Sequence, residues 1–308
     1  MKNYYRVMLG RKSIHAKECF AENFVGTDFD IGQDLTHKLP EEWRAFNKEF
    51  IPIFLARNPD KTKIGAGLAC GALWTVSKGI KIGDVVLCPD GTGRYRVGDV
   101  TGDYAYRADR VLPHTRAVSW RTLPIDRTDM SDALKNSTGS IGTVSNITRY
   151  HEEIEKLISG FPLTATASVD EAVEDQVAFV MEKYLEDFLV TNWAQTDLGK
   201  EFDIYEDEGE RVGQQYLTDT GPLDILAISK DKKSLLVVEL KKGRASDTVV
   251  GQTLRYMSFV KDELAEEGQL VKGVIIALED DKKIRRALAI TPSIGFYRYQ
   301  INFKLIKS

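Results

Sequence analysis

Charged residues interrupt two apolar runs that otherwise have the composition of buried β-strands. The first run is Gly221-Pro222-Leu223-Asp224-Ile225-Leu226, and the second is Leu235-Leu236-Val237-Val238-Glu239-Leu240-Lys241. A short polar segment separates them, so the pair predicts a β-hairpin. Charged groups are costly to bury without a partner. A fold that accepts this hairpin must therefore supply Asp224, Glu239 and Lys241 with partners or use them as a site.

The register of the hairpin predicts where these charges meet. If Ile228 pairs with Leu235, antiparallel pairing places Asp224 opposite Glu239, and Lys241 projects from the same face. Two carboxylates about 4 Å apart repel by about 4 kcal/mol at an effective dielectric of about 20. Lys241 offsets part of this repulsion, and Mg²⁺, which prefers oxygen ligands, would offset more. A surface Glu-x-Lys pair is the alternative, but the apolar residues before Glu239 favour a strand that is buried on both faces.

The segment after the hairpin adds polar groups. Gln252 and Tyr256 are four residues apart, so they share one face of a helix predicted near 248–266. A glutamine there can hold an attacking water, although an ordinary polar helix face fits the spacing equally well. Positive charge beside the carboxylates comes from Lys242, Arg244 and Arg255. We predict that these residues and Tyr256 contact nucleic acid.

In combination, these motifs resemble the PD-(D/E)xK nuclease superfamily, and most closely NucS-like endonucleases and Mrr-type restriction endonuclease domains. The resemblance covers about residues 170–308 and implies a restriction-endonuclease-like α/β sandwich of the αβββαβ type. It implies DNA as the substrate and Mg²⁺ as the cofactor, with Mn²⁺ as a substitute. It implies Asp224 and Glu239 as metal ligands, with the Leu240 carbonyl as a third. Lys241 would then orient or activate water, with Gln252 as a helper.

The same resemblance places a glutamate on the first helix of the domain, near the metal. Glu182 and Glu186 are one turn apart in the helix that Ser168 or Asp170 is predicted to cap. Glu186 matches the family pattern better. A solvated helix face is the alternative for each of the two glutamates.

A domain boundary is predicted near residue 165. Residues 151–159 have the pattern of a short amphipathic helix, and the stretch Gly160-Phe161-Pro162-Leu163-Thr164-Ala165-Thr166-Ala167-Ser168 has the small residues and proline of a linker. We therefore expect a β-rich recognition domain over 1–165 and a nuclease domain over 166–308.

The first half predicts short strands separated by glycine turns, which suggests a small barrel or a strongly bent sheet. Strands are expected over 85–88, 95–100 and 117–120, and a helix over 39–56. The segment 65–145 faintly resembles PUA-like and EVE-like domains, which implies recognition of modified bases. An aromatic cage beside polar groups would hold a flipped base. The residues predicted to contact nucleic acid are Trp74, Tyr104 and Arg116, although composition alone favours a core role for the tryptophan.

Composition sets limits on partners and location. The 308 residues are 43% hydrophobic and 29% charged, with a formal net charge of −4. This charge argues against coating of nucleic acid by bulk charge, but phosphate contacts need only a local basic patch. Three scattered cysteines indicate neither a disulfide framework nor a zinc site. With no apolar run of membrane-span length, no signal-peptide pattern and no P-loop, we expect a cytoplasmic protein without a membrane or nucleotide partner.

The sequence therefore predicts a Mg²⁺-dependent endodeoxyribonuclease, serving restriction or antiviral defence, whose N-terminal domain reads modified DNA. One alternative is a repair endonuclease that recognises mismatched, branched or single-stranded DNA. Another is a nucleic-acid-binding module that no longer cleaves. Cutting both strands with one site per chain favours a homodimer.

Overall fold

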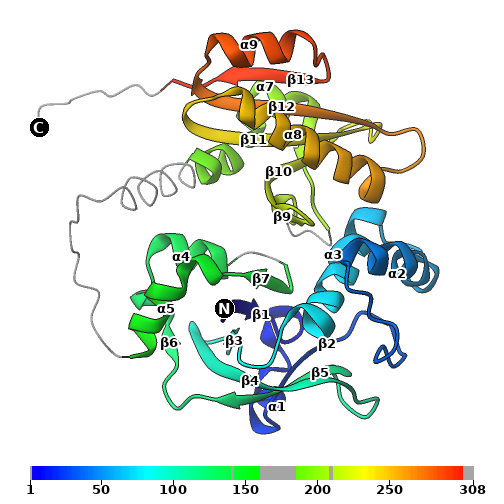
Figure 1. Ribbon diagram of the computed structural model, residues 1–308, viewed down its shortest axis with the longest axis vertical. Coiled ribbons are helices and arrows are strands. Elements are labelled where there is room, and N and C mark those ends of the chain that lie inside the picture. Colours follow the sequence, from blue (N-terminus) through cyan, green and yellow to red (C-terminus); the bar gives the residue numbers. More distant parts are fainter. Residues whose placement is uncertain (1, 140–141, 160–184, 208–210, 301–308) are drawn as a thin grey trace, which may run out of the picture. The chain divides into compact units, whose positions relative to one another are not determined.

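The computed structural model describes residues 2–139, 142–159, 185–207 and 211–300 (Figure 1). The chain divides into two compact units, Met1–Ala167 and Ser168–Ser308, and each has a β-sheet and a core of its own. The protein is therefore a mixed α/β chain of two units, as expected. The predicted boundary near residue 165 lies outside the described residues, as does most of the helix predicted to follow it, with Glu182.

The N-terminal unit is built on a sheet with the strand order β2-β5-β4-β3-β1-β7, and β6 pairs with β4. Its strands are β1 (Tyr4–Val7), β2 (Phe24–Thr27), β3 (Val85–Pro89), β4 (Arg94–Tyr106), β5 (His114–Trp120), β6 (Ile125–Asp126) and β7 (Val144–Asn146). The register between β4 and β5 shifts between Val100 and Tyr104, an irregularity of the kind that bends strands. No pairing among the described residues joins β2 to β7. The described pairings thus do not close the sheet into a barrel, and of the two predicted forms they agree better with the strongly bent sheet than with the small barrel.

Helices make up more of this unit than the sequence suggested. They are α1 (Ala16–Ala21), α2 (Trp43–Arg57), α3 (Lys63–Trp74), α4 (Asp132–Thr138) and α5 (His151–Ile158). The helices predicted over 39–56 and 151–159 are α2 and α5. Helix α3 was not predicted, because its glycines and small residues give a weak helix signal.

The glycines of α3 serve its packing against α2. A Cβ atom at Gly71 would lie 2.6 Å from the ring of Trp43 on α2, so only glycine admits this close approach. The phenylalanines of α2 recur at helical spacing, and the rings of Phe46 and Phe50 stack with centroids 4.3 Å apart. They form a core with α3, separate from the core of the sheet.

The C-terminal unit contains a mixed sheet with the order β13-β12-β11-β10-β8, and β9 also pairs with β10. Its elements are α7 (Asp197–Glu201), β8 (Phe202–Ile204), β9 (Gln214–Thr218), β10 (Gly221–Ser229), β11 (Ser234–Arg244), α8 (Asp247–Phe259), β12 (Leu270–Glu279), α9 (Lys282–Ala289) and β13 (Ile294–Arg298). Strands β11 and β12 run parallel, so α8 serves as the crossover between them. Figure 1 shows the described part of this unit in green to red.

The predicted hairpin is present as β10 and β11. Ile228 pairs with Leu235, which is the register on which the site prediction depends. Residues 234–240 of β11 are all buried, because β10 and β12 flank this strand. The hairpin and α8 lie close to their predicted places, whereas α7, β8 and β9 were not predicted.

Candidate active site

The ladder between β10 and β11 ends where the charged residues begin. The last backbone pair is Ile225 with Val238, one step before Asp224 and Glu239 would face each other. The Asp224 carboxylate instead takes the place of a ladder partner: its Oδ2 accepts a hydrogen bond from the Leu240 N–H at 2.7 Å. The strands thus separate at the point where the charged side chains need room.

Glu239 and Lys241 meet directly on β11. The Nζ atom of Lys241 lies 2.9 Å from Oε1 of Glu239. The Glu239 side chain is 2% exposed, whereas that of Lys241 is 29% exposed, so the lysine lies between the buried carboxylate and solvent. This contact follows from alternation along the strand, which puts residues i and i+2 on the same face.

Glu186 joins the same cluster from a distant part of the sequence. It is 3% exposed, and both of its carboxylate oxygens accept hydrogen bonds from β9. Gln214 Nε2 donates to Oε1 at 2.6 Å, and Gln215 Nε2 donates to Oε2. The Gln215 amide also donates to Asp224 Oδ1 at 3.2 Å. Glu186 is therefore placed beside Asp224, not on a solvated helix face.

The carboxylates raise one another's cost of ionisation. The pKa of Asp224 is well above its ordinary value, first because burial removes water from the charged form, and then because Glu239 and Glu186 carry like charge. The Leu240 N–H and Lys241 act in the opposite direction. A cation bound here would favour the ionised form of Asp224.

The donors at this site suit a hard divalent cation. Asp224 and Glu239 supply carboxylate oxygens, and Mg²⁺ is typically held by one or two carboxylates while it keeps several waters. Within the described residues, no group of three or more His, Cys, Asp or Glu side chains is arranged to hold a metal ion. Asp224 and Glu239 would therefore hold such an ion only with water completing its coordination. The contribution of the Leu240 carbonyl stays a prediction.

Helix α8 supports the hairpin through Tyr256. This side chain is 5% exposed, and its hydroxyl donates to the Pro222 carbonyl at 3.0 Å, two residues before Asp224. Gln252 Nε2 lies 3.5 Å from the same hydroxyl. Tyr256 was predicted to contact nucleic acid, but its burial instead makes it a brace between α8 and β10. Gln252 is partly exposed, and its predicted role as a helper that holds water stays a prediction.

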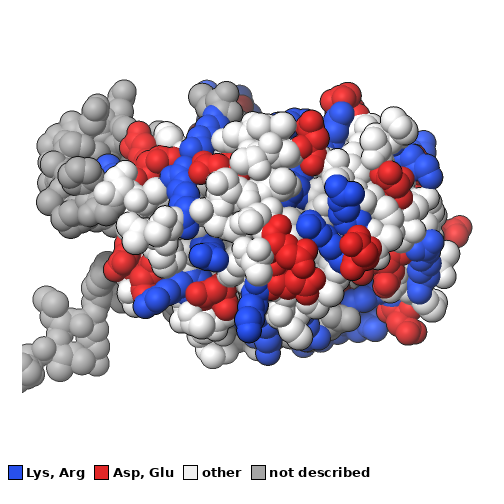
Figure 2. All heavy atoms as spheres, turned by 90° about the horizontal axis from the view of Figure 1, so that it is seen from below, with Lys and Arg blue, Asp and Glu red and all other residues white. Residues whose placement is uncertain are grey.

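The predicted basic residues differ in how their charge is used. Arg244 lies within 3.3 Å of Glu279 on the neighbouring strand, so part of its charge is already compensated. Arg255 is exposed on α8, and Lys242 is partly exposed after Lys241. On the face shown in Figure 2, Lys and Arg are interspersed with Asp and Glu.

In the N-terminal unit, the structure does not expose Arg116 as predicted. It is 4% exposed, and its guanidinium donates to the main-chain carbonyls of Val76 and Ser77, both at 2.7 Å. This arginine thus provides hydrogen-bond donors for main-chain carbonyls in the turn that follows α3. Its burial argues against the predicted contact with nucleic acid.

Trp74 and Tyr104 are partly buried and pack against the core of α2 and α3. Trp74 Nε1 donates to the Pro40 carbonyl at 3.1 Å. The Tyr104 hydroxyl is 2.9 Å from His114 Nδ1, and His114 Nε2 is 2.8 Å from the Ile31 carbonyl. Burial lowers the pKa of His114. Nε2 carries a proton, because the Ile31 carbonyl can only accept a hydrogen bond. The Tyr104–His114 pair thus anchors the loop that contains Ile31. The rings of Trp74 and Tyr104 are partly exposed, and their predicted contact with a base stays a prediction.

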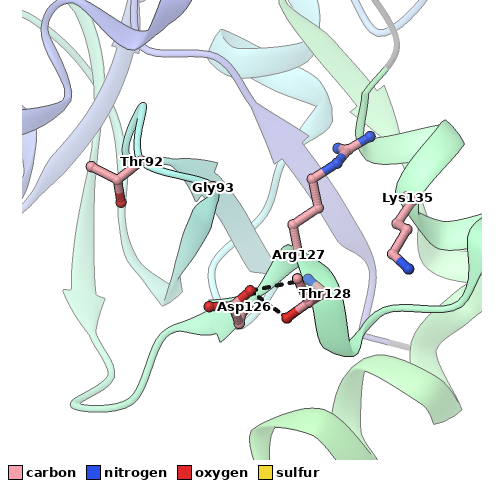
Figure 3. Close-up of a pocket in the computed structure, with 6 residues that line it drawn as sticks. All are labelled: Thr92, Gly93, Asp126, Arg127, Thr128 and Lys135. Carbon is pink, nitrogen blue, oxygen red and sulfur yellow. Dashed lines mark hydrogen bonds between the residues drawn. The ribbon is translucent and has the colours of Figure 1, made fainter.

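A hollow of about 410 Å³ opens on the N-terminal unit (Figure 3). Its lining residues are Thr92, Gly93, Asp126, Arg127, Thr128 and Lys135. Asp126 Oδ1 accepts from the main chain and hydroxyl of Thr128, at 3.0 and 2.7 Å. None of these lining residues, all in the described part of the chain, is aromatic, so this hollow is not the predicted cage for a base.

Sequence reasoning missed Gln214 and Gln215. Two adjacent glutamines give no catalytic signal by themselves. The buried acids were the available signal, because a carboxylate that leaves water needs hydrogen-bond donors. Gln214 and Gln215 precede the strand of Asp224 and could have been predicted to supply such donors.

Comparison with known proteins gives two domain matches. Residues 5–148 match a domain of unknown function (DUF8426). Residues 195–296 match the C-terminal domain of endonuclease NucS, which confirms the predicted resemblance of this unit. The PUA-like and EVE-like resemblance of the first half stays a prediction. No curated protein matches this chain.

Two solved structures show distant likeness. One is a complex of EndoMS with double-stranded DNA, at 12% identity and a TM-score of 0.33, covering 70% of this chain and 68% of its own. The other is a repair endonuclease from Pyrococcus abyssi, at 16% identity and a TM-score of 0.28, covering 69% of this chain and 66% of its own. We base no functional argument on likeness at this level.

Proposed function

We propose that this chain, whose C-terminal unit carries a NucS-type endonuclease domain, is a metal-dependent endonuclease that hydrolyses DNA. The observation that carries the proposal is the meeting of Asp224, Glu239, Lys241 and Glu186 within the segment that matches that domain and beside it. A structural ion pair needs one acid and one base, whereas three acids around one lysine leave net negative charge for a cation.

The residues have distinct roles in this mechanism. Asp224 and Glu239 would hold Mg²⁺ or Mn²⁺, which supplies charge neutralisation at the scissile phosphate and acidifies water. Lys241, at the solvent side of Glu239, orients the attacking water and donates a hydrogen bond to it. Gln252 holds that water from α8. Lys242 and Arg255 contact phosphates on either side of the cut.

Two classes of DNA substrate fit this site. We place first a repair role, in which the N-terminal unit recognises mismatched, branched or single-stranded DNA by its structure, because the catalytic unit is of the NucS type. Restriction or defence by reading modified bases is the second candidate. The partly exposed rings of Trp74 and Tyr104 are the observation that favours it.

A cleavage panel tests these proposals. Mismatched, branched, single-stranded, modified and unmodified DNA would be incubated with the protein and Mg²⁺, with chelator as the control. We expect Asp224→Ala and Lys241→Ala to abolish cleavage while melting shows a folded protein. Full activity in either variant would refute the mechanism. Preference for modified duplex would favour restriction.

The same panel bears on assembly and on the non-catalytic alternative. Nicked products indicate cutting by one site, whereas double-strand breaks together with a dimer in light scattering would support the predicted homodimer. No cleavage and no effect of Mg²⁺ or Mn²⁺ on stability or DNA affinity would favour a binding module.

A further inference from the structure

Strand β9 has an unusual backbone at the point where it meets the acidic cluster formed by Asp224, Glu239 and Glu186. Leu223 pairs with Tyr216, and Ile225 pairs with Gln214, so Gln215 occupies the position that faces Asp224. Gln215 has φ +52°, in the left-handed region that residues other than glycine rarely adopt. Such strain persists where surrounding interactions fix it, often at functional sites.

This backbone conformation has a consequence for the side chains. In a regular strand, successive side chains point to opposite faces, so two adjacent glutamines do not reach the same group. Here Gln214 and Gln215 both donate to Glu186, one to each carboxylate oxygen. The left-handed residue breaks the alternation and brings both amides to one carboxylate.

The Gln215 amide links carboxylates from different parts of the fold, whereas the Gln214 amide links two neighbouring acids. The Gln215 amide donates to Glu186 and, at 3.2 Å, to Asp224 Oδ1. The Gln214 amide donates to Glu186 and, at 3.1 Å, to Asp187 Oδ1. An amide NH₂ group has two N–H donors, so Gln215 has one for each of the two acids that it bridges.

The neutrality of these donors matters as much as their position. An arginine or lysine would hold the acids more strongly, but its positive charge would compete with a metal cation for them. Glutamine compensates part of the loss of water around the carboxylates and leaves their negative charge in place. It therefore fixes the geometry of a cation site without adding a positive charge that would compete with the cation.

We propose that Gln215, assisted by Gln214, is a positioning residue that holds the proposed metal ligand Asp224 against Glu186 and so fixes the geometry of the metal site. This role rests on the proposed function. Hydrogen-bonding partners of metal ligands generally change metal affinity ten- to a hundredfold when they are removed, and we expect an effect of that size.

The test compares metal binding by the metal-free full-length protein and its variants. Gln215→Met keeps the length of the side chain but removes its donors, and Gln215→Asn keeps the amide but is too short to bridge. Gln215→Lys adds a positive charge. Gln195→Met, at an exposed position, is the matched control. Mn²⁺ affinity is measured by calorimetry, metal-induced change in melting temperature by calorimetric scanning, and cleavage at saturating metal by initial rates.

We expect Gln215→Met and Gln215→Asn to bind Mn²⁺ ten- to a hundredfold more weakly than the wild type and Gln195→Met. Gln215→Lys should fold but lose the metal-induced rise in melting temperature. A purely structural role predicts a lower melting temperature with unchanged affinity in the folded variants. If Gln215→Met does not fold, Gln215→Asn and Gln215→Lys still decide the question.

The outcomes separate this inference from the proposed function. Affinity and rate within twofold of wild type in the folded Gln215 variants would overturn the positioning role and leave the nuclease proposal standing. Wild-type protein that binds Mn²⁺ but cleaves no DNA would overturn the nuclease proposal alone. Wild-type protein that does neither would overturn both.

Discussion

At the scale of single residues, the site is a balance between buried acids and the groups that compensate them. Asp224 receives the Leu240 N–H and the Gln215 amide, while Glu239 receives Lys241. These contacts do not cancel the effect of burial and like charge, because the pKa of Asp224 is still raised. The cost of holding the acids together is what makes binding of a cation favourable.

This raised pKa predicts how stability of the metal-free protein depends on pH. The folded state holds the Asp224 proton more tightly than the unfolded chain, where the pKa is about 3.8. The free energy of unfolding should therefore fall as pH rises from about 3.8 through the raised pKa of the folded state, by up to about 1.4 kcal/mol per pH unit for one proton. Asp224→Asn should reduce this slope. Urea unfolding at a series of pH values, with chelator, would measure it.

The outcome against this prediction is equally plain. Equal slopes for the wild type and Asp224→Asn would show that Asp224 does not change its proton affinity on folding. Added Mg²⁺ should oppose the loss of stability at higher pH in the wild type and have less effect in the variant.

At the scale of elements, the site depends on where a β-ladder stops. Strands β10 and β11 pair up to Ile225 and Val238, and their separation beyond this pair lets Asp224 turn toward Leu240. Helix α8 then fixes β10 from outside the sheet through the Tyr256 hydroxyl and the Pro222 carbonyl. The position of Asp224 is thus set by its own strand, by β9 and by α8.

Removing the hydroxyl of Tyr256 tests the contribution of α8. Tyr256→Phe leaves the Pro222 carbonyl without this donor, so we expect a loss of about 1 kcal/mol in stability and a several-fold fall in kcat, with DNA affinity unchanged. Tyr297→Phe is the control, since Tyr297 is 42% exposed on β13. Urea unfolding, cleavage rates and DNA titration provide the measurements. A fall in DNA affinity without a change in kcat would instead support the direct nucleic-acid contact first predicted for Tyr256.

At the scale of the whole molecule, the two units have separate cores and sheets. The acidic cluster is built entirely from residues of the C-terminal unit. Among the described residues, no helix is long and apolar enough to span a membrane. The proposed catalytic site therefore lies within one unit, and substrate recognition by the other unit stays a proposal.

This separation predicts how the C-terminal unit behaves alone. A fragment that begins at residue 168 should fold, bind Mn²⁺ with an affinity close to that of the full chain, and cleave DNA with little preference among substrates. The full chain should retain its preference in the same panel. A fragment that melts normally but fails to bind Mn²⁺ would show that the N-terminal unit contributes to the site.

The sequence by itself determined the hairpin and its charged residues. Asp224, Glu239 and Lys241 stand out because they interrupt apolar runs, and period-two alternation with the Ile228–Leu235 register predicts their common face. These are local patterns, so they can be recognised without knowledge of the rest of the fold. Helix α8 follows from periodicity in the same way.

Only the tertiary structure decided which distant groups complete the site. Glu186 precedes the hairpin by more than thirty residues, and Gln215 enters through a left-handed backbone that no side-chain pattern announces. The structure also argues against the predicted nucleic-acid contacts of Arg116 and Tyr256. Both side chains are buried and donate hydrogen bonds to main-chain carbonyls. Burial and long-range hydrogen bonding depend on how elements pack, and one-dimensional spacing carries little information about them.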